Sequence, residues 1–139
     1  MNRLESAPRT YADGHVAITF LFGSAIGPFS RRLMQWIHAC GDCDEATRDK
    51  DWIGYAPHVI SGREPVAEFE RVKNVIAQFT SKRTKATLLE AALERGLLIA
   101  PVSTIEEVVE SEQLAARDYW QPIAHAELGR SIVYPGAFA

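Results

Sequence analysis

The sequence predicts an α+β fold in which a small antiparallel sheet packs with four to five helices. One observation is the alternation of apolar side chains over Val16–Phe22, which is typical of a strand. A second is a pair of strand-like segments, Tyr119–Ile123 and Ser131–Tyr134, that can fold back on each other as a hairpin with a long loop. A third is the interleaving of these segments with helical patterns. We therefore expect Val16–Phe22, Leu97–Ala100 and the hairpin to share one antiparallel sheet, with helices on one side.

At the amino-terminal end, residues 1–10 are polar and aperiodic, and we expect a flexible tail there. The strand Val16–Phe22 follows a turn at Asp13-Gly14. Pro28 suits the first turn of the next helix, which Gly41 can end. Apolar side chains in this helix recur at the spacing of one buried stripe.

The middle of the chain predicts further helices. Residues 44–51 can form a short helix, and a clear amphipathic pattern runs from residue 65 to residue 79. Thr84 is the expected N-cap of the next helix. Taken together, the apolar sides of the periodic segments give a predicted core of Phe20, Phe29, Leu33, Trp36, Phe69, Ile76, Leu89, Leu93 and Ile99.

Four local signals agree in the segment that follows. Gly96 can take a positive φ just past the end of a helix, and Leu97–Ala100 is a short apolar run typical of a buried strand. Pro101 cannot donate a ladder hydrogen bond, so it ends the strand or marks a sheet edge. Thr104 and Glu107 have the spacing of a capping box at the start of another helix.

Composition argues against several functional classes. The net charge of −3 over 139 residues does not favour nucleic-acid binding, which needs a basic surface. No apolar run approaches the roughly 18 residues that span a bilayer, and residues 1–10 lack the apolar middle of a signal peptide. We expect a cytoplasmic protein with reduced cysteines.

Cys40 and Cys43 form the one motif with possible redox or zinc chemistry. A structural zinc site needs four ligands, and the chain holds only these two cysteines. A redox pair normally opens a helix, whereas this pair follows one. We therefore expect no metal and no functional disulfide at these cysteines.

Other patterns carry no recognisable chemistry. The acidic residues between 42 and 51 do not match the ligand positions of a calcium loop, and no phosphate-binding glycine loop occurs. The four histidines lie in unrelated segments, so no nucleophile–base pair can be argued from spacing. We assign no catalytic, cofactor-binding or metal-binding residue from these patterns.

A series of short motifs nevertheless resembles one known family. They are Asp13-Gly14-His15-Val16, Thr84-Lys85, Leu88-Leu89, Arg95-Gly96, Ala100-Pro101-Val102, Glu107-Val108, Gln113-Leu114-Ala115-Ala116-Arg117, Gly129 and Tyr134-Pro135-Gly136. In this order they resemble family III CoA-transferases of the CaiB/BaiF-like type, which include formyl-CoA and carnitine CoA-transferases and 2-methylacyl-CoA racemases. The resemblance covers roughly residues 11–137.

The resemblance implies that this chain corresponds to the small domain only. Complete members are much longer and add a large CoA-binding domain of Rossmann type, and two chains interlock. Their nucleophile is an aspartate of the large domain, which is acylated and then carries CoA as a thioester. None of Asp42, Asp44, Asp49, Asp51 or Asp118 matches that position.

These implications divide the chain into a tail over residues 1–10, a small domain over 11–130, and a last strand and linker over 131–139. We expect a fragment of a CoA-transferase that is inactive alone and holds no cofactor. CoA would be the substrate of the complete enzyme. Expected partners are a second copy of the chain or a separate large CoA-binding domain, without nucleic acid or membrane. Tyr119, Trp120 and residues 133–138 are the expected docking surface. The alternative is a free-standing module that binds a protein or a small molecule.

Overall fold

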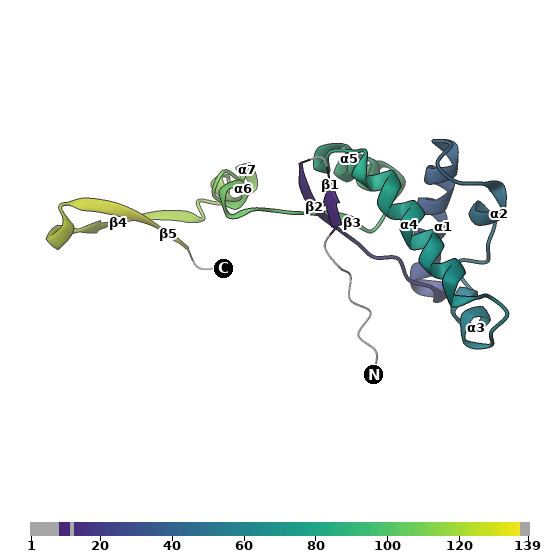
Figure 1. The fold of residues 1–139 in the computed structure, drawn as a ribbon. Helices are drawn as coiled ribbons and strands as arrows, with labels where there is room; N and C mark the ends of the chain where they lie inside the picture. The colour runs from purple at the N-terminus through teal and green to yellow at the C-terminus, as the bar shows by residue number, and fades with distance from the viewer. Residues whose placement is uncertain (1–8, 12, 137–139) are drawn as a thin grey trace. The chain divides into compact units, whose positions relative to one another are not determined.

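The computed structural model describes residues 9–11 and 13–136, and it confirms the α+β fold (Figure 1). Its contacts divide the chain into an amino-terminal unit, Met1–Val102, and a carboxyl-terminal unit, Ser103–Ala139. The elements of the amino-terminal unit are, in order, β1 (Arg9–Tyr11), β2 (Gly14–Ile18), α1 (Gly23–Ala39), α2 (Glu45–Arg48), α3 (Tyr55–Ile60), α4 (Val66–Ser81), α5 (Lys85–Arg95) and β3 (Ile99–Val102).

The sheet of the amino-terminal unit has three antiparallel strands in the order β1-β2-β3. The predicted pairing of the two central segments is confirmed, with Val16 opposite Pro101 and Ile18 opposite Ile99. Pro101 lies inside β3 at the edge of the sheet, where a missing N–H costs no ladder bond. Arg9 and Thr10 pair in β1, although they fall in the predicted tail, whose residues 1–8 lie outside the described residues.

The junction between β2 and α1 differs from the prediction. The strand ends at Ile18, and α1 begins at Gly23, so that Pro28 lies inside the helix. Phe20 and Phe22 alternate because both turn toward one aromatic cluster with Trp52, at ring-centroid distances of 5.3 and 6.3 Å. Their spacing therefore reflects burial beside Trp52 and not a continuing strand.

Gly27 lets α1 approach the segment that carries Trp52 closely. A Cβ atom at residue 27 would lie 2.7 Å from the Cα atom of Ile53 and 2.9 Å from the carbonyl oxygen of Trp52. Real Cβ atoms do not come so near to backbone, so only glycine fits without a shift. This contact joins the first helix to the segment between α2 and α3.

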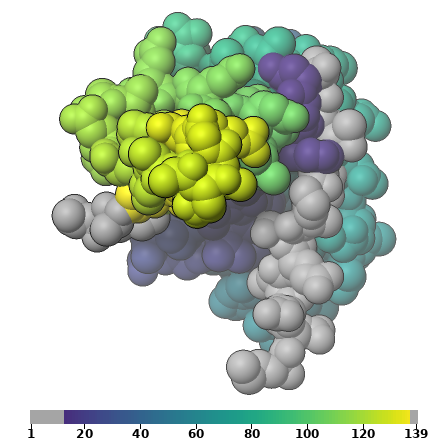
Figure 2. All heavy atoms as spheres, turned by 90° about the vertical axis from the view of Figure 1, so that its left-hand side faces the viewer, coloured from purple at the N-terminus to yellow at the C-terminus, as the bar shows by residue number. Residues whose placement is uncertain are grey.

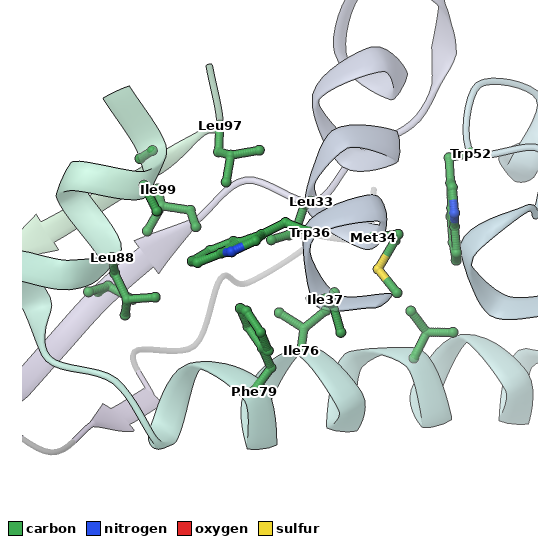
Figure 3. Close-up of a cluster of buried hydrophobic side chains, with 14 of the residues drawn as sticks. Leu33, Met34, Trp36, Ile37, Trp52, Ile76, Phe79, Leu88, Leu97 and Ile99 are labelled. Carbon is green, nitrogen blue, oxygen red and sulfur yellow. The ribbon is translucent and has the colours of Figure 1, made fainter. Parts of the chain in front are cut away.

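The core of the amino-terminal unit forms between α1, α4, α5 and the sheet (Figure 3). Of the predicted core residues, Leu33, Trp36, Ile76 and Ile99 are buried, and Phe20, Phe29 and Phe69 are half-buried. The prediction is wrong for the remaining two, because Leu89 is 37% exposed and Leu93 is 78% exposed. Helix α5 turns a different face to the core, made of Lys85, Leu88, Ala91 and Ala92.

Local signals around α5 and β3 are confirmed. Thr84 caps α5 by accepting a hydrogen bond from the Thr87 N–H, and Gly96 ends the helix at φ 60°. Thr104 and Glu107 form the predicted capping box at the start of α6. These signals depend on neighbouring residues only, which is why sequence reasoning reaches them.

The carboxyl-terminal unit contains α6 (Ile105–Val109), α7 (Glu112–Ala115), β4 (Trp120–His125), a 3₁₀ turn (Ala126–Leu128) and β5 (Arg130–Pro135). The predicted hairpin exists, but β4 and β5 form a two-stranded sheet of their own and do not join the sheet of β1–β3 as expected. We call this pair of strands the ribbon. Its loop is shorter than predicted, because both strands extend to the turn that ends at Gly129.

Candidate functional site

The aspartates nearest to the cysteines stabilise local structure. Asp42 accepts a hydrogen bond from the Lys82 ammonium at 2.7 Å, and this bond holds the pKa of its carboxyl below the usual value. Asp44 caps α2, where hydrogen bonds from Thr47 lower its pKa. Carboxylates in such contacts stabilise the local structure in their ionised form.

The other aspartates of the acidic segment have similar roles. Arg48 binds Asp49 through two hydrogen bonds of 2.6 and 2.7 Å, which lower the pKa of that carboxyl. Asp51 accepts a hydrogen bond from the Gly54 N–H at 3.0 Å. Farther along the chain, Asp118 has a φ of 49°, the turn conformation that precedes β4. The five aspartates that the sequence argument excluded as nucleophiles thus form turns, helix caps or ion pairs.

The cysteines lie at the carboxyl end of α1. Cys40 is exposed at the C-cap, and Cys43 is half-buried with its Sγ atom 3.8 Å from the Met34 carbonyl oxygen. Burial raises the pKa of the Cys43 thiol, which disfavours the reactive thiolate. Both cysteines are free thiols in the structure.

A network of charged side chains joins α2 to α4. Lys50 bridges Glu64 and Glu68 at 2.5 and 3.3 Å, and Arg71 binds both Glu68 and the Thr47 hydroxyl. Tyr55 lies beside this network, and its pKa is raised to about 12. The main cause is burial, and the charges of Glu64 and Glu68 add to it. The phenol is therefore protonated at neutral pH and cannot serve as a base there.

The four histidines lie in β2, α1, α3 and β4, as their separation in sequence suggests. His125 stands at the end of β4, half-buried, with the Tyr134 hydroxyl 3.2 Å from its Nε2 atom and the Glu127 carboxylate 3.4 Å from its Nδ1 atom. Within residues 9–11 and 13–136, no three His, Cys, Asp or Glu side chains come together as metal ligands. None of the helices in these ranges is long and apolar enough to cross a membrane.

The carboxyl-terminal unit presents the most distinctive surface. None of its described residues is buried, and Figure 2 shows its atoms, in green and yellow, at the surface. Apolar side chains are exposed along α6, the ribbon and the turn between its strands: Ile105, Val108, Val109, Ile123, Leu128, Val133 and Tyr134. A unit of two short helices and a two-stranded sheet cannot form a core of its own.

The sequence argument found part of this surface. Of the expected docking residues, Val133, Tyr134 and Pro135 are exposed, Tyr119, Trp120 and Gly136 are half-buried, and residues 137 and 138 lie outside the described ones. It missed the apolar side chains of α6. The available signal was length, because a helix of five residues with three apolar side chains has no second turn with which to bury them.

Charge also distinguishes this unit. Residues 103–139 contain six acidic side chains and two arginines, which gives a net charge of −4, whereas the whole chain carries −3. Four of the acidic side chains, from Glu106 to Glu112, lie on or beside α6 and α7. The surface of the unit is therefore both apolar and acidic.

Comparison with known proteins gives the chain its family. The family model of CoA-transferase family III matches residues 26–139. The subunit BbsE of succinyl-CoA:(R)-benzylsuccinate CoA-transferase from Thauera aromatica is 33% identical over 127 residues. That match covers 91% of this chain and 30% of BbsE, so the chain spans less than a third of its relative. No solved structure matches the chain. Because the family model covers most of the sequence, the chain belongs to CoA-transferase family III.

Proposed function

We propose that this chain supplies the small domain of a family III CoA-transferase of the CaiB/BaiF-like type and is inactive alone. The observation that carries the proposal is the family match over residues 26–139, combined with coverage of only 30% of BbsE. The complete enzyme moves CoA between carboxylic acids through an aspartyl intermediate. Its nucleophile and its CoA-binding domain lie outside these 139 residues, either in a longer protein or in a second polypeptide.

The name of the relative supports an enzyme made of more than one polypeptide, and it indicates a substrate class. BbsE is called a subunit, and its enzyme acts on succinyl-CoA and (R)-benzylsuccinate. By extension, the complete enzyme here takes CoA thioesters of carboxylic acids as substrates. CoA is a substrate on this proposal, and the chain itself holds no cofactor and no metal.

The proposal also includes the setting and the partners. We place the protein in the cytoplasm, with Cys40 and Cys43 as thiols. Partners are a large CoA-binding domain or a second copy of the chain. The acidic net charge argues against nucleic acid.

The test measures transfer of CoA from succinyl-CoA to carboxylic acids, together with titration calorimetry with CoA. The purified chain alone is expected to show no transfer, because it brings no nucleophile to form the covalent intermediate. It is also expected to show no micromolar CoA binding, because its sequence holds no phosphate-binding glycine loop. The second arm uses a BbsE variant from which the 127 matched residues have been removed and replaced by a Gly/Ser linker. Co-expression with the chain is expected to restore transfer.

Two controls make the result specific. The shortened BbsE has to be inactive without the chain, and intact BbsE has to be active under the same conditions, each with any other subunit of its enzyme present. Transfer or micromolar CoA binding by the chain alone would refute the proposal. So would failure of the co-expressed pair to transfer CoA when both polypeptides are folded.

The second candidate is a free-standing module that binds a protein or a small molecule. The exposed apolar surface of the carboxyl-terminal unit favours a protein over a small molecule. A stable complex with a partner, formed without any CoA transfer, would favour this candidate.

A further inference from the structure

One histidine of the carboxyl-terminal unit has a hydrogen-bonding partner at each ring nitrogen. His125 ends β4, Glu127 lies in the 3₁₀ turn, and Tyr134 lies in β5. The Tyr134 hydroxyl oxygen is 3.2 Å from Nε2 of His125, and a carboxylate oxygen of Glu127 is 3.4 Å from Nδ1. A phenol and a carboxylate thus meet at opposite sides of one imidazole.

The two partners determine where the protons of this cluster lie. An ionised carboxylate can only accept hydrogen bonds, so the neutral imidazole has its proton on Nδ1, toward Glu127. Nε2 then carries the lone pair, and the Tyr134 hydroxyl donates its hydrogen bond to it. A hydroxyl that donates to a base, with a third group that orients the base, is the arrangement that activates an oxygen nucleophile.

Strand pairing brings the phenol and the imidazole together. Side chains on one face recur at every second residue and lie opposite each other across the pair of strands. His125 is paired with Arg130, so Arg130, Ile132 and Tyr134 lie on the face that carries His125. The two rings come within 5.7 Å, centroid to centroid, and Ile132 is half-buried. The phenol therefore meets the imidazole only while β4 and β5 are paired in this register.

Tyr134 is also accessible to a reactant from solvent. It is 38% exposed, and the side chain of His125 is 25% exposed. Tyr55, in contrast, is 1% exposed and has a pKa raised to about 12, so it offers no nucleophile. A phenol is a weak nucleophile, and it reacts readily only with an activated acyl group such as a thioester. The CoA thioesters proposed above as substrates belong to this chemical class.

We propose that Tyr134 is a modification site, which takes an acyl group from an acyl-CoA thioester, with His125 as the base and Glu127 as the residue that orients it. The phenol oxygen forms a bond to the acyl carbon, and the bond from that carbon to sulfur breaks. The phenol proton passes to Nε2 of His125 and then to the departing thiolate. The products are an aryl ester on Tyr134 and free CoA.

This inference takes its reactant from the proposed function and goes beyond it. The acyl group stays on the chain, so one chain reacts once and no new CoA thioester forms. Tyr134 is therefore an acceptor of the acyl group and not a replacement for the nucleophile of the complete enzyme.

The first measurement is the rate at which the full chain becomes acetylated on Tyr134. One arm uses p-nitrophenyl acetate, a neutral activated ester, and the other uses acetyl-CoA; mass spectrometry of the digested chain locates the label. Tyr134 is expected to react at least about tenfold faster than N-acetyltyrosinamide under the same conditions. Tyr119, whose ring packs against Trp120 at 5.0 Å, is the internal comparison and is expected to react no faster than the amide. Hydroxylamine is expected to remove the label, because it cleaves an aryl ester but not an acetylated lysine.

Substitutions then test each role. Tyr134→Phe is expected to abolish the label at residue 134, and His125→Gln to lower the rate to that of the free amide. Glu127→Gln is expected to slow labelling at least about threefold, whereas Glu127→Asp, which keeps the carboxylate, retains most of the rate. The matched control is Arg130→Gln, which changes the residue opposite His125 but neither the phenol nor the imidazole. Its labelling by the neutral ester is expected to be unchanged.

The outcomes separate this inference from the proposed function. Equal rates for Tyr134 and the free amide would overturn the inference, as would unchanged labelling in His125→Gln or an equal loss in Arg130→Gln. Labelling by the neutral ester without labelling by acetyl-CoA would overturn the thioester as the reactant. Restored CoA transfer in the co-expressed pair, with an unreactive Tyr134, would keep the proposed function alone. A labelled Tyr134 without restored transfer would support the inference and count against the proposed function.

Discussion

At the scale of single residues, the absence of a side chain at Gly27 decides how closely two segments approach. The backbone of Trp52 and Ile53 occupies the space in which a Cβ atom at residue 27 would lie. In the sequence alone, a glycine that allows close approach of two segments looks the same as one that allows a turn. Only the partner segment, 25 residues away, distinguishes the two.

Gly27→Ala is expected to lower the free energy of unfolding by about 1–3 kcal/mol, since the clash is with backbone and cannot be relieved by a side-chain rotation. The loss outweighs the roughly 1 kcal/mol by which alanine favours a helix over glycine. Denaturant unfolding measures the change. Ser24→Ala, at an exposed position of the same helix, is the control and should stay within about 0.5 kcal/mol of the original protein.

At the scale of elements, the sequence predicts helix α5 correctly but assigns the wrong face of it to the core. Three leucines, Leu88, Leu89 and Leu93, lie in this helix, and their spacing allows two overlapping stripes. The core selects the one through Lys85, Leu88 and Ala92. Ala91 and Ala92 lie on this face beside Leu88, where β3 runs close to the helix, so small residues as well as a large one mark the buried side.

Leu88→Ala is expected to cost about 2–5 kcal/mol of unfolding free energy, because Leu88 is fully buried and its removal leaves a cavity. Leu93→Ala is expected to change stability by less than about 0.5 kcal/mol. Thermal or denaturant unfolding of the two variants compares the faces directly. Equal losses would show that α5 buries the leucine stripe after all.

Local rules explain most of what the sequence predicts about these elements. Caps such as Thr84, turns such as Gly96 and the capping box of Thr104 depend on residues within one helical turn. The separate sheet of β4 and β5 could not be foreseen in this way, because membership of a sheet depends on which edges are open. The expectation that no catalytic residue lies in this chain rests on the family resemblance alone and stays a prediction.

At the scale of the whole molecule, the two units differ in kind. The amino-terminal unit buries fifteen hydrophobic residues in one core, whereas the described part of the carboxyl-terminal unit buries none. The first therefore accounts for its own stability, and the second does not. This difference, and not the length of the chain, determines which part depends on other surfaces.

A chain that ends at Thr104 is therefore expected to unfold cooperatively with nearly the same midpoint as the full chain. Residues 105–136 contribute no buried side chain, and the Val102 carbonyl that accepts from Lys85 is kept. Calorimetry of both chains measures the two midpoints. A loss of cooperativity in the shorter chain would show that residues 105–139 stabilise the amino-terminal unit.

The positions of Pro122 and Pro135 also affect how readily the ribbon can stack with other strands. Two apolar strands left in water are the kind of segment that stacks into fibrils, and stacking needs an unbroken row of backbone donors along an edge. Each proline interrupts that row on one strand. The exposed ribbon is therefore a poor template for fibril growth, in spite of its apolar side chains.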